Sequence, residues 1–165
     1  MNLGGQHLNN EKPKANTFPP QHQNHQPGTE GEMHPSPISV DNRYRGSEKL
    51  KDKVAVITGG DSGIGKSVSI YFAKEGADVV IVYFNEDQDA TKTKQLVEKE
   101  GRKCMLLAGD IGNEDFCKSV IEQTLSKFGK IDILVNNAAE QHPQKSIIDI
   151  TAQQLERTFR TNIFS

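Results

Sequence analysis

The sequence has little that would place the protein in a membrane, on a nucleic acid or in an oxidising compartment. No stretch approaches the ~20 apolar residues of a membrane span. The net charge of −2 supplies no basic surface for nucleic acid. Cysteine occurs only twice, as Cys104 and Cys117, in an expected strand and an expected helix. Two such thiols form no disulfide framework, so we expect a cytoplasmic protein with no membrane and no nucleic-acid partner.

Aliphatic side chains are also scarce in the first 46 residues, and this divides the chain into two parts. The first part holds six of the seven prolines and four of the five histidines. It cannot bury enough apolar surface to offset the entropy of ordering it. We therefore expect residues 1–46 to form a disordered or extended arm that is no signal or transit peptide and holds no cofactor residue. The histidines of the arm are irregularly spaced, with no Cys or Asp cluster, and predict no metal site; they are His7, His22, His25 and His34.

From Lys53 onward, short apolar runs alternate with amphipathic stretches. Four runs predict strands, over residues 54–57, 79–82, 105–107 and 131–135. Helices are expected between them, one with Ile64, Val68 and Phe72 along a single face, and one over Ala90–Glu100 with Leu96 and Val97 inward. Gly76, Gly101 and Gly129 stand where these helices end, and Thr151 opens a last helix with Leu155, Phe159 and Ile163 on one face.

This alternation predicts an α/β fold for residues 47–165, a doubly wound parallel sheet with strand order 3-2-1-4. In such sheets the ligand binds outside the carboxyl ends of the strands, where the strand order reverses. Here that point lies between the first and the fourth strand.

The loop after the first strand is rich in glycine and has two interpretations. Its backbone N–H groups and the positive end of the next helix suit a pyrophosphate. Gly60 to Ser67 match the P-loop of an NTPase, in which Lys66 would reach the terminal phosphates and Ser67 would hold magnesium. Counted from Thr58, the same loop is Thr-Gly-x-x-x-Gly-x-Gly. The loop alone does not decide between the two.

Three later motifs favour the second interpretation. Asn136-Asn137-Ala138-Ala139 follows the fourth strand, Asp110-Ile111 follows the third, and Asn162 lies in the last helix. With the loop, they resemble the short-chain dehydrogenase/reductase family, which has a Rossmann-type fold; Ala139 replaces the family's usual glycine. Tyr44-Arg45-Gly46-Ser47 after a Pro-rich arm is similar to a bacterial subgroup that contains general-stress proteins and aldehyde reductases.

The resemblance implies an NAD(P)-dependent oxidoreductase that transfers a hydride between nicotinamide and a small-molecule carbonyl or alcohol. It implies Asn162 as a catalytic residue. The residues that it implies for the cofactor are Thr58, Gly59, Asp61, Ser62, Gly63, Ile64, Gly65, Tyr83, Phe84, Asp110, Ile111, Asn136, Ala138 and Ala139.

The choice between NAD and NADP is expected at the end of the second strand. An acidic residue there would bind the ribose 2′-hydroxyl of NAD, and an arginine the 2′-phosphate of NADP. Tyr83 and Phe84 occupy these positions, so this rule gives no answer. Asp61, Glu86 and Asp87 lie nearby and would repel an extra phosphate, which favours NAD.

The family's catalytic serine and Tyr-x-x-x-Lys motif are absent from this chain. None of Tyr44, Tyr71 and Tyr83 is followed by a lysine four positions later. We therefore expect a truncated, cofactor-binding half that is inactive alone, and the resemblance implies a homo-tetramer for the full-length protein. A dinucleotide-binding fragment without turnover is the non-enzymatic alternative.

Overall fold

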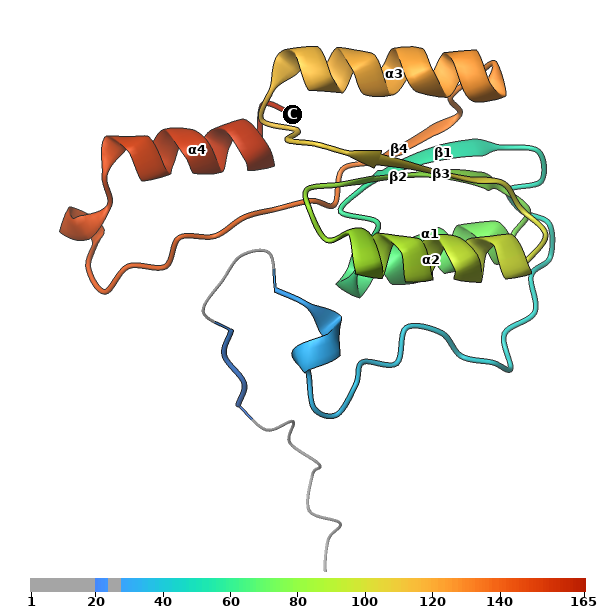
Figure 1. The fold of residues 1–165 in the computed structure, drawn as a ribbon, viewed down its shortest axis with the longest axis horizontal. Coiled ribbons are helices and arrows are strands. Elements are labelled where there is room, and N and C mark those ends of the chain that lie inside the picture. The colour runs from blue at the N-terminus through green and yellow to red at the C-terminus, as the bar shows by residue number, and fades with distance from the viewer. Residues whose placement is uncertain (1–19, 24–27) are drawn as a thin grey trace, which may run out of the picture.

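Four parallel strands form one sheet with helices on both faces (Figure 1). The computed structural model describes residues 20–23 and 28–165. The sheet has the order β3-β2-β1-β4, as predicted. Its strands are β1 (Val54–Thr58), β2 (Asp78–Tyr83), β3 (Cys104–Ala108) and β4 (Ile133–Val135).

The helices form a layer on each face of the sheet and one element to the side (Figure 1). α1 (Gly63–Lys74) and α2 (Asp87–Lys99) cover one face, and α3 (Glu114–Phe128) covers the other. α4 (Ala152–Asn162) lies to the side of these layers. Two short 3-10 turns, η1 (Glu30–Glu32) and η2 (Ile147–Asp149), complete the described elements. In the described part of the chain, no helix has both the length and the apolar character that a membrane crossing requires.

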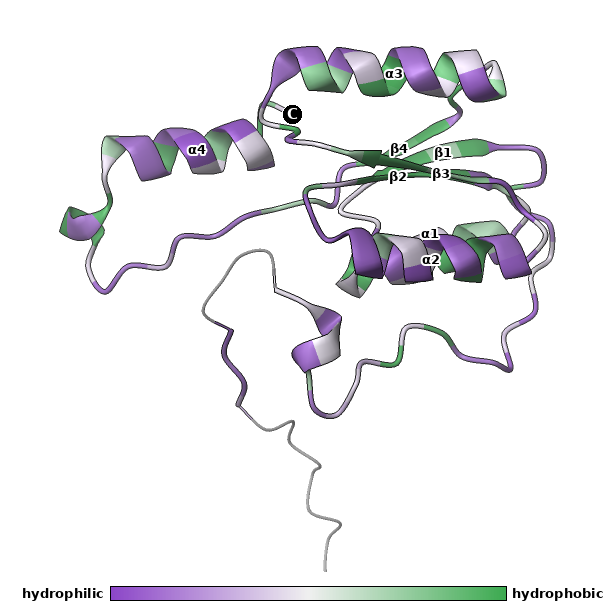
Figure 2. Cartoon of the chain, in the orientation of Figure 1, coloured by the Kyte–Doolittle hydropathy of each residue, from purple (hydrophilic) through white to green (hydrophobic). Residues whose placement is uncertain are grey.

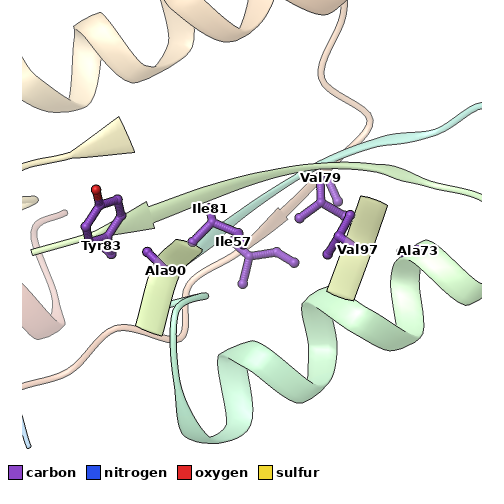
Figure 3. Close-up of a cluster of buried hydrophobic side chains, with 8 residues drawn as sticks. Ile57, Ala73, Val79, Ile81, Tyr83, Ala90 and Val97 are labelled. Carbon is purple, nitrogen blue, oxygen red and sulfur yellow. The ribbon is translucent and has the colours of Figure 1, made fainter. Parts of the chain in front are cut away.

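The two central strands are buried on both faces, which explains their uninterrupted apolar runs. Ile57 and Ile81 pack with Ala73 and Val97 between the sheet and the α1–α2 layer (Figure 3). The alternate residues of the same strands, with Leu107 and Val120, form a second cluster. Figure 2 shows the resulting pattern, with apolar strands inside and polar helix surfaces outside.

Several local predictions differ from the structure. Ile64 was expected on one helix face with Val68 and Phe72. Those two pack against the core, but Ile64, in the first turn of α1, is 77% exposed. α2 begins at Asp87 rather than Ala90, and its buried face carries Thr93 and Val97, whereas Leu96 is only half-buried. β4 is shorter than predicted and begins at Ile133. The Asp132 amide just before it donates to the Val54 carbonyl, and the Asp132 carboxylate accepts from the Val54 amide.

The end signals of the helices were predicted more accurately. Gly129 caps α3 in the left-handed conformation, with φ of 78°. Thr151 caps α4 as expected, and Gln154 completes a reciprocal capping box with it. The apolar side chains predicted for one face of α4, Leu155, Phe159 and Ile163, are all exposed in this chain.

The described part of the N-terminal arm (residues 1–46) runs beside the α1–α2 layer (Figure 1). The ring of Tyr44 meets the ring of Tyr71 edge to face at 4.9 Å, and the Tyr44 hydroxyl donates to the Glu75 carboxylate. The rest of the predicted arm, residues 1–19 and 24–27, lies outside the described residues and includes His7 and His25. Over the residues that are described, no group of His, Cys, Asp and Glu side chains could hold a metal ion.

Candidate functional site

A cavity of about 390 Å³ opens where the four strands reach their carboxyl ends. The glycine loop, the segments after β2, β3 and β4, and helix α4 all contribute to its wall. This is the position predicted for a ligand in a doubly wound sheet. The lining residues are Gly59, Asp61, Ser62, Val82, Tyr83, Phe84, Gly109, Asp110, Ile111, Asn137, Ala138, Ala139, Glu140, His142, Arg157 and Thr161.

The glycine loop is so tightly folded that side chains are excluded at two positions. A Cβ on Gly65 would lie 1.9 Å from the carbonyl oxygen of Gly59. Gly59 has φ of +63°, and a Cβ there would be 3.0 Å from the Cα of Ala138. Ser62 precedes α1 without capping it through its side chain. Of the first amides of α1, that of Gly63 donates to the Glu30 carboxylate, whereas those of Ile64 and Gly65 can donate to a phosphate.

The loop is held to the end of β4 by Thr58 and Asn137. The backbone amides of Asn137 and Ala138 donate to Thr58 Oγ1 at 3.0 and 3.1 Å. Asn137 Nδ2 donates in return to the carbonyl oxygens of Thr58 and Gly59. Asn136, which we expected at the cofactor, is exposed and does not line the cavity. Since side chains alternate along a strand, only one residue of this asparagine pair can face the loop.

Two carboxylates and one guanidinium form the polar wall opposite the loop. Arg157 Nη1 contacts Asp110 Oδ2 at 2.5 Å, and Arg157 Nη2 contacts Glu140 Oε2 at 2.9 Å. The hydrogen bond from Arg157 lowers the pKa of Asp110. Burial alone would raise the pKa of Glu140, but hydrogen bonds from Arg157, His142 and Thr161 outweigh it and lower that pKa. Both carboxylates are therefore ionised at neutral pH.

Asn162, the implied catalytic residue, closes α4 and binds the loop after β4. Its Oδ1 accepts from the Glu140 amide at 2.9 Å, and its Nδ2 donates to the Glu140 carbonyl at 3.0 Å. Its side chain is exposed and does not line the cavity, whereas its neighbour Thr161 does. In this chain Asn162 thus fixes the position of Glu140.

The end of β2 carries no basic residue for a 2′-phosphate. Tyr83 is buried, and its hydroxyl donates to the Asp87 carboxylate at 2.6 Å. Burial, and then Asp87, raise the pKa of Tyr83 to about 12. Asp61 is also buried; desolvation raises its pKa, and the carboxylates of Asp89 and Glu30 add to the rise.

The structure brings most of the predicted cofactor residues to the cavity. Those that line it are Gly59, Asp61, Ser62, Tyr83, Phe84, Asp110, Ile111, Ala138 and Ala139. Those that do not are Thr58, Gly63, Ile64, Gly65 and Asn136. Thr58 and Gly65 shape the loop without lining the cavity: Thr58 accepts the Asn137 amide, and Gly65 packs against the Gly59 carbonyl. Gly63 and Ile64 form the first turn of α1.

Sequence reasoning missed two groups of residues at this site. Arg157 and Glu140 belong to none of the motifs; the only available signal was that Arg157 and Thr161 are four positions apart on one helix face. Glu30 of the arm was not singled out from the sequence. It does not line the cavity, but its carboxylate accepts a hydrogen bond from the Gly63 amide at 2.8 Å and pairs with Lys66.

The same contacts bear on the alternative interpretation of the loop as a P-loop. Lys66 is engaged by Glu30, and the Ser67 hydroxyl donates back to the Gly63 carbonyl at 3.3 Å. Neither side chain lines the cavity. The structure therefore gives no support to a P-loop NTPase.

Comparison with known proteins identifies the family. The model of a family described as short chain dehydrogenase matches residues 53–165. General stress protein 39 of Bacillus subtilis is 58% identical over 148 residues, which are 90% of this chain and 52% of that protein. Glucose and ribitol dehydrogenase of Daucus carota is 47% identical over 154 residues, which are 90% of this chain and 53% of that protein.

Solved structures agree with these relatives. A short chain dehydrogenase from Burkholderia cenocepacia, in complex with NADP, superposes with a TM-score of 0.68 at 30% identity and covers 70% of this chain and 47% of that one. This chain spans about half the length of the curated relatives that it matches. From the family match over residues 53–165 and the agreement of the fold, this chain belongs to the short-chain dehydrogenase family.

Proposed function

We propose that this chain is the cofactor-binding part of an NAD(P)-dependent oxidoreductase acting on a small carbonyl or alcohol substrate. The observation that carries the proposal is the cavity at the carboxyl ends of the strands, closed on one side by a glycine loop that tolerates no side chain at Gly65. We also propose that residues 47–165 form the nucleotide-binding domain and that residues 1–46 form an arm outside its sheet.

The cavity lies where a doubly wound sheet binds a dinucleotide, at the carboxyl ends of its strands. The amides at the start of α1, beside the glycine loop, would hold the pyrophosphate. Asp110 and Ile111 would contact the adenine, and Ala138 and Ala139 would lie beside the nicotinamide ribose. When bound, the nicotinamide supplies or accepts the hydride.

The chain's own part in the reaction is binding and positioning. Asn162 would hold the loop after β4 through the backbone of Glu140. The three tyrosines are unsuited to donate a proton to substrate. The hydroxyls of Tyr44 and Tyr83 already donate to Glu75 and Asp87, and Tyr71, whose hydroxyl accepts from the Asp41 backbone amide, does not line the cavity. We propose that residues 1–165 supply cofactor binding within the full-length protein, and that turnover needs residues beyond this chain.

The preference between NAD and NADP rests on opposing arguments. The carboxylates of Asp61, Asp87 and Asp89 near the end of β2 favour NAD, because they repel a 2′-phosphate. The Burkholderia structure was solved with NADP, and this weighs against that lean. We therefore propose NAD(P) as the cofactor class. The preference is to be determined from the ratio of the dissociation constants of NAD and NADP.

Three further properties of the full-length protein are proposals. The name of the Daucus carota relative supports a polyhydroxylated alcohol or sugar as substrate. The unpaired thiols of Cys104 and Cys117 support a cytoplasmic location. A homo-tetramer is proposed on family resemblance alone.

Binding in the full-length protein tests the main proposal directly. NAD(H) or NADP(H) should raise the melting temperature, because a ligand that binds only the folded state stabilises it. Mg-ATP at the same concentration serves as the control. Stabilisation by Mg-ATP without any response to either dinucleotide would contradict the proposal. Oxidation or reduction of sugar alcohols and aldehydes, followed through the absorbance of reduced nicotinamide, then tests the substrate class.

A further inference from the structure

One residue of the N-terminal arm reaches the glycine loop. Glu30 is separated from the loop by residues 31–53 and by all of β1, yet its carboxylate bridges two groups at the start of α1. Oε1 accepts the Gly63 amide at 2.8 Å, and Oε2 pairs with Lys66 Nζ. The side chains of Glu30 and Lys66 are only 13% and 14% exposed. The contact is thus a sheltered ion pair rather than a loose surface encounter.

The arm is held in this place by a second contact. The Glu30 amide donates to Asp89 Oδ2 at 3.2 Å, and the other oxygen of Asp89 pairs with Lys92 at 3.0 Å. Asp89 is buried in the first turn of α2. Asp61, which lines the cavity, is close enough to sense the charges of both Asp89 and Glu30. Glu30 therefore adds a carboxylate to the corner between the glycine loop and α2.

In the proposed dinucleotide site, the adenosine ribose would lie near this corner, beside the glycine loop and the end of the second strand. The two cations of the corner, Lys66 and Lys92, are both neutralised by carboxylates. Without Glu30, Lys66 would be an unpaired cation next to the positive end of α1. That combination attracts a phosphate.

We propose that Glu30 is a cofactor-specificity residue that neutralises Lys66 and so disfavours the 2′-phosphate of NADP. The inference rests on the proposed dinucleotide site. It assigns to the arm a part in cofactor choice that the end of β2, with Tyr83 and Phe84, does not supply.

A double-mutant cycle in the full-length protein tests this assignment, with the dissociation constants of NADH and NADPH as readouts. Glu30→Gln keeps the size of the side chain and its acceptor oxygen but removes the charge. It should tighten NADPH binding by about three- to tenfold and change NADH binding by less than about twofold, as expected for one partly sheltered charge at a helix end. The gain should shrink as salt is added.

Lys66→Gln in the Glu30→Gln background should abolish the gain, because the freed cation is its source. Asp41→Asn is the matched control, since it removes an arm carboxylate that pairs with Arg43 away from the loop; it should leave the NADPH/NADH ratio unchanged. Melting temperatures of all variants check that each one is folded.

The outcomes separate this inference from the proposed function. An equal effect of Glu30→Gln on both dinucleotides, or a gain that survives the loss of Lys66, would overturn the specificity role. A Glu30→Gln variant with the same ratio of NADPH to NADH dissociation constants as the wild type would overturn it as well. If the wild-type protein binds neither dinucleotide, the proposed function is wrong and this inference falls with it.

Discussion

The side-chain amide of Asn137 donates to the carbonyl oxygen of Gly59 at 3.1 Å and thereby ties the end of β4 to the glycine loop beside it. The neighbouring residues are as close: Ala138 Cα would lie 3.0 Å from a Cβ on Gly59. The loop and the end of β4 are therefore in direct contact. Its shape depends on an asparagine that the motif alone did not distinguish from Asn136.

The two asparagines should behave differently when they are replaced. Asn137→Ala removes both hydrogen bonds from the side-chain amide to the carbonyls of Thr58 and Gly59. It should lower the free energy of unfolding by about 1–3 kcal/mol, because partly buried carbonyls lose their partners. Asn136→Ala, at an exposed position, should change it by less than about 0.5 kcal/mol in this part of the fold. Denaturant unfolding of the two variants gives the comparison, and equal losses would show that the tie to the loop is unimportant.

Gly65 should be the most sensitive position of the loop for cofactor binding. Gly65→Val places a branched side chain where a Cβ would already lie 1.9 Å from the Gly59 oxygen, so the loop must open. We expect the dissociation constant of NADH to rise at least about tenfold, or 1.4 kcal/mol. Lys66→Ala is the matched control and should alter NADH binding far less. Calorimetric titration measures both; the reverse order would favour the P-loop interpretation.

The sheet could be predicted from the sequence because its signals are local. The apolar runs of β1 and β2 and the glycine that caps α3 depend on neighbours within a few residues. The failures occurred where a distant partner decides. Asp132 interrupts an apolar run, and its carboxylate accepts a hydrogen bond from the amide of Val54, which is far from it in the sequence.

The site was predictable to the extent that family motifs cover it. Gly59, Asp110 and Ala138 belong to such motifs and do line the cavity. Arg157 and Glu140 carry most of the charge of the opposite wall, but they come together only through the path of the chain between β4 and α4. Glu30 lies in a segment whose composition indicates no fold at all. Composition predicts that the segment has no hydrophobic core. It does not predict a single polar contact with a distant loop.

Arg157 should contribute more to stability than the arginine next to it on α4. Arg157→Gln leaves Asp110 and Glu140 without their shared cation and should cost about 1–2 kcal/mol, a value reduced because the pairs are partly exposed to solvent. Arg160→Gln removes an exposed pair with Glu156 and should cost less than about 0.5 kcal/mol. Similar losses in denaturant melts would mean that the Asp110–Arg157–Glu140 wall adds nothing to the fold.

Glu75 should make the arm sensitive to acid. Its carboxylate accepts hydrogen bonds from the Tyr44 hydroxyl and from the amides of Lys49 and Ser47, which lower its pKa to about 2. A carboxyl group with a depressed folded-state pKa stabilises the protein fully above its unfolded-state value of about 4.5. This contribution is lost as the pH falls from about 5 to 2.

Glu75→Gln should therefore lower the melting temperature at pH 7, and the difference from wild type should vanish near pH 2. Glu48→Gln is the control, because the Glu48 side chain is exposed and its carboxylate forms a surface ion pair with Lys51. Thermal melts across this pH range measure both variants. A Glu75→Gln difference that is constant with pH would contradict the role of the ionised carboxylate.

Residues 1–165 expressed alone should aggregate and reduce no carbonyl substrate. Leu134 of β4 is 55% exposed, and Ile121 and Leu125 of α3 are 41% and 46% exposed. Burial of apolar surface is worth about 25 cal/mol per Å², and a domain has only about 5–15 kcal/mol of stability in total. Uncovered apolar side chains at the edge strand and on the neighbouring helix therefore favour association between copies.

Ile121→Lys combined with Leu125→Lys should raise the monomer fraction in size-exclusion chromatography while leaving thermal unfolding nearly unchanged. A wild-type fragment that stays monomeric, unfolds cooperatively and turns over substrate would refute the prediction, and it would require a catalytic group within these 165 residues.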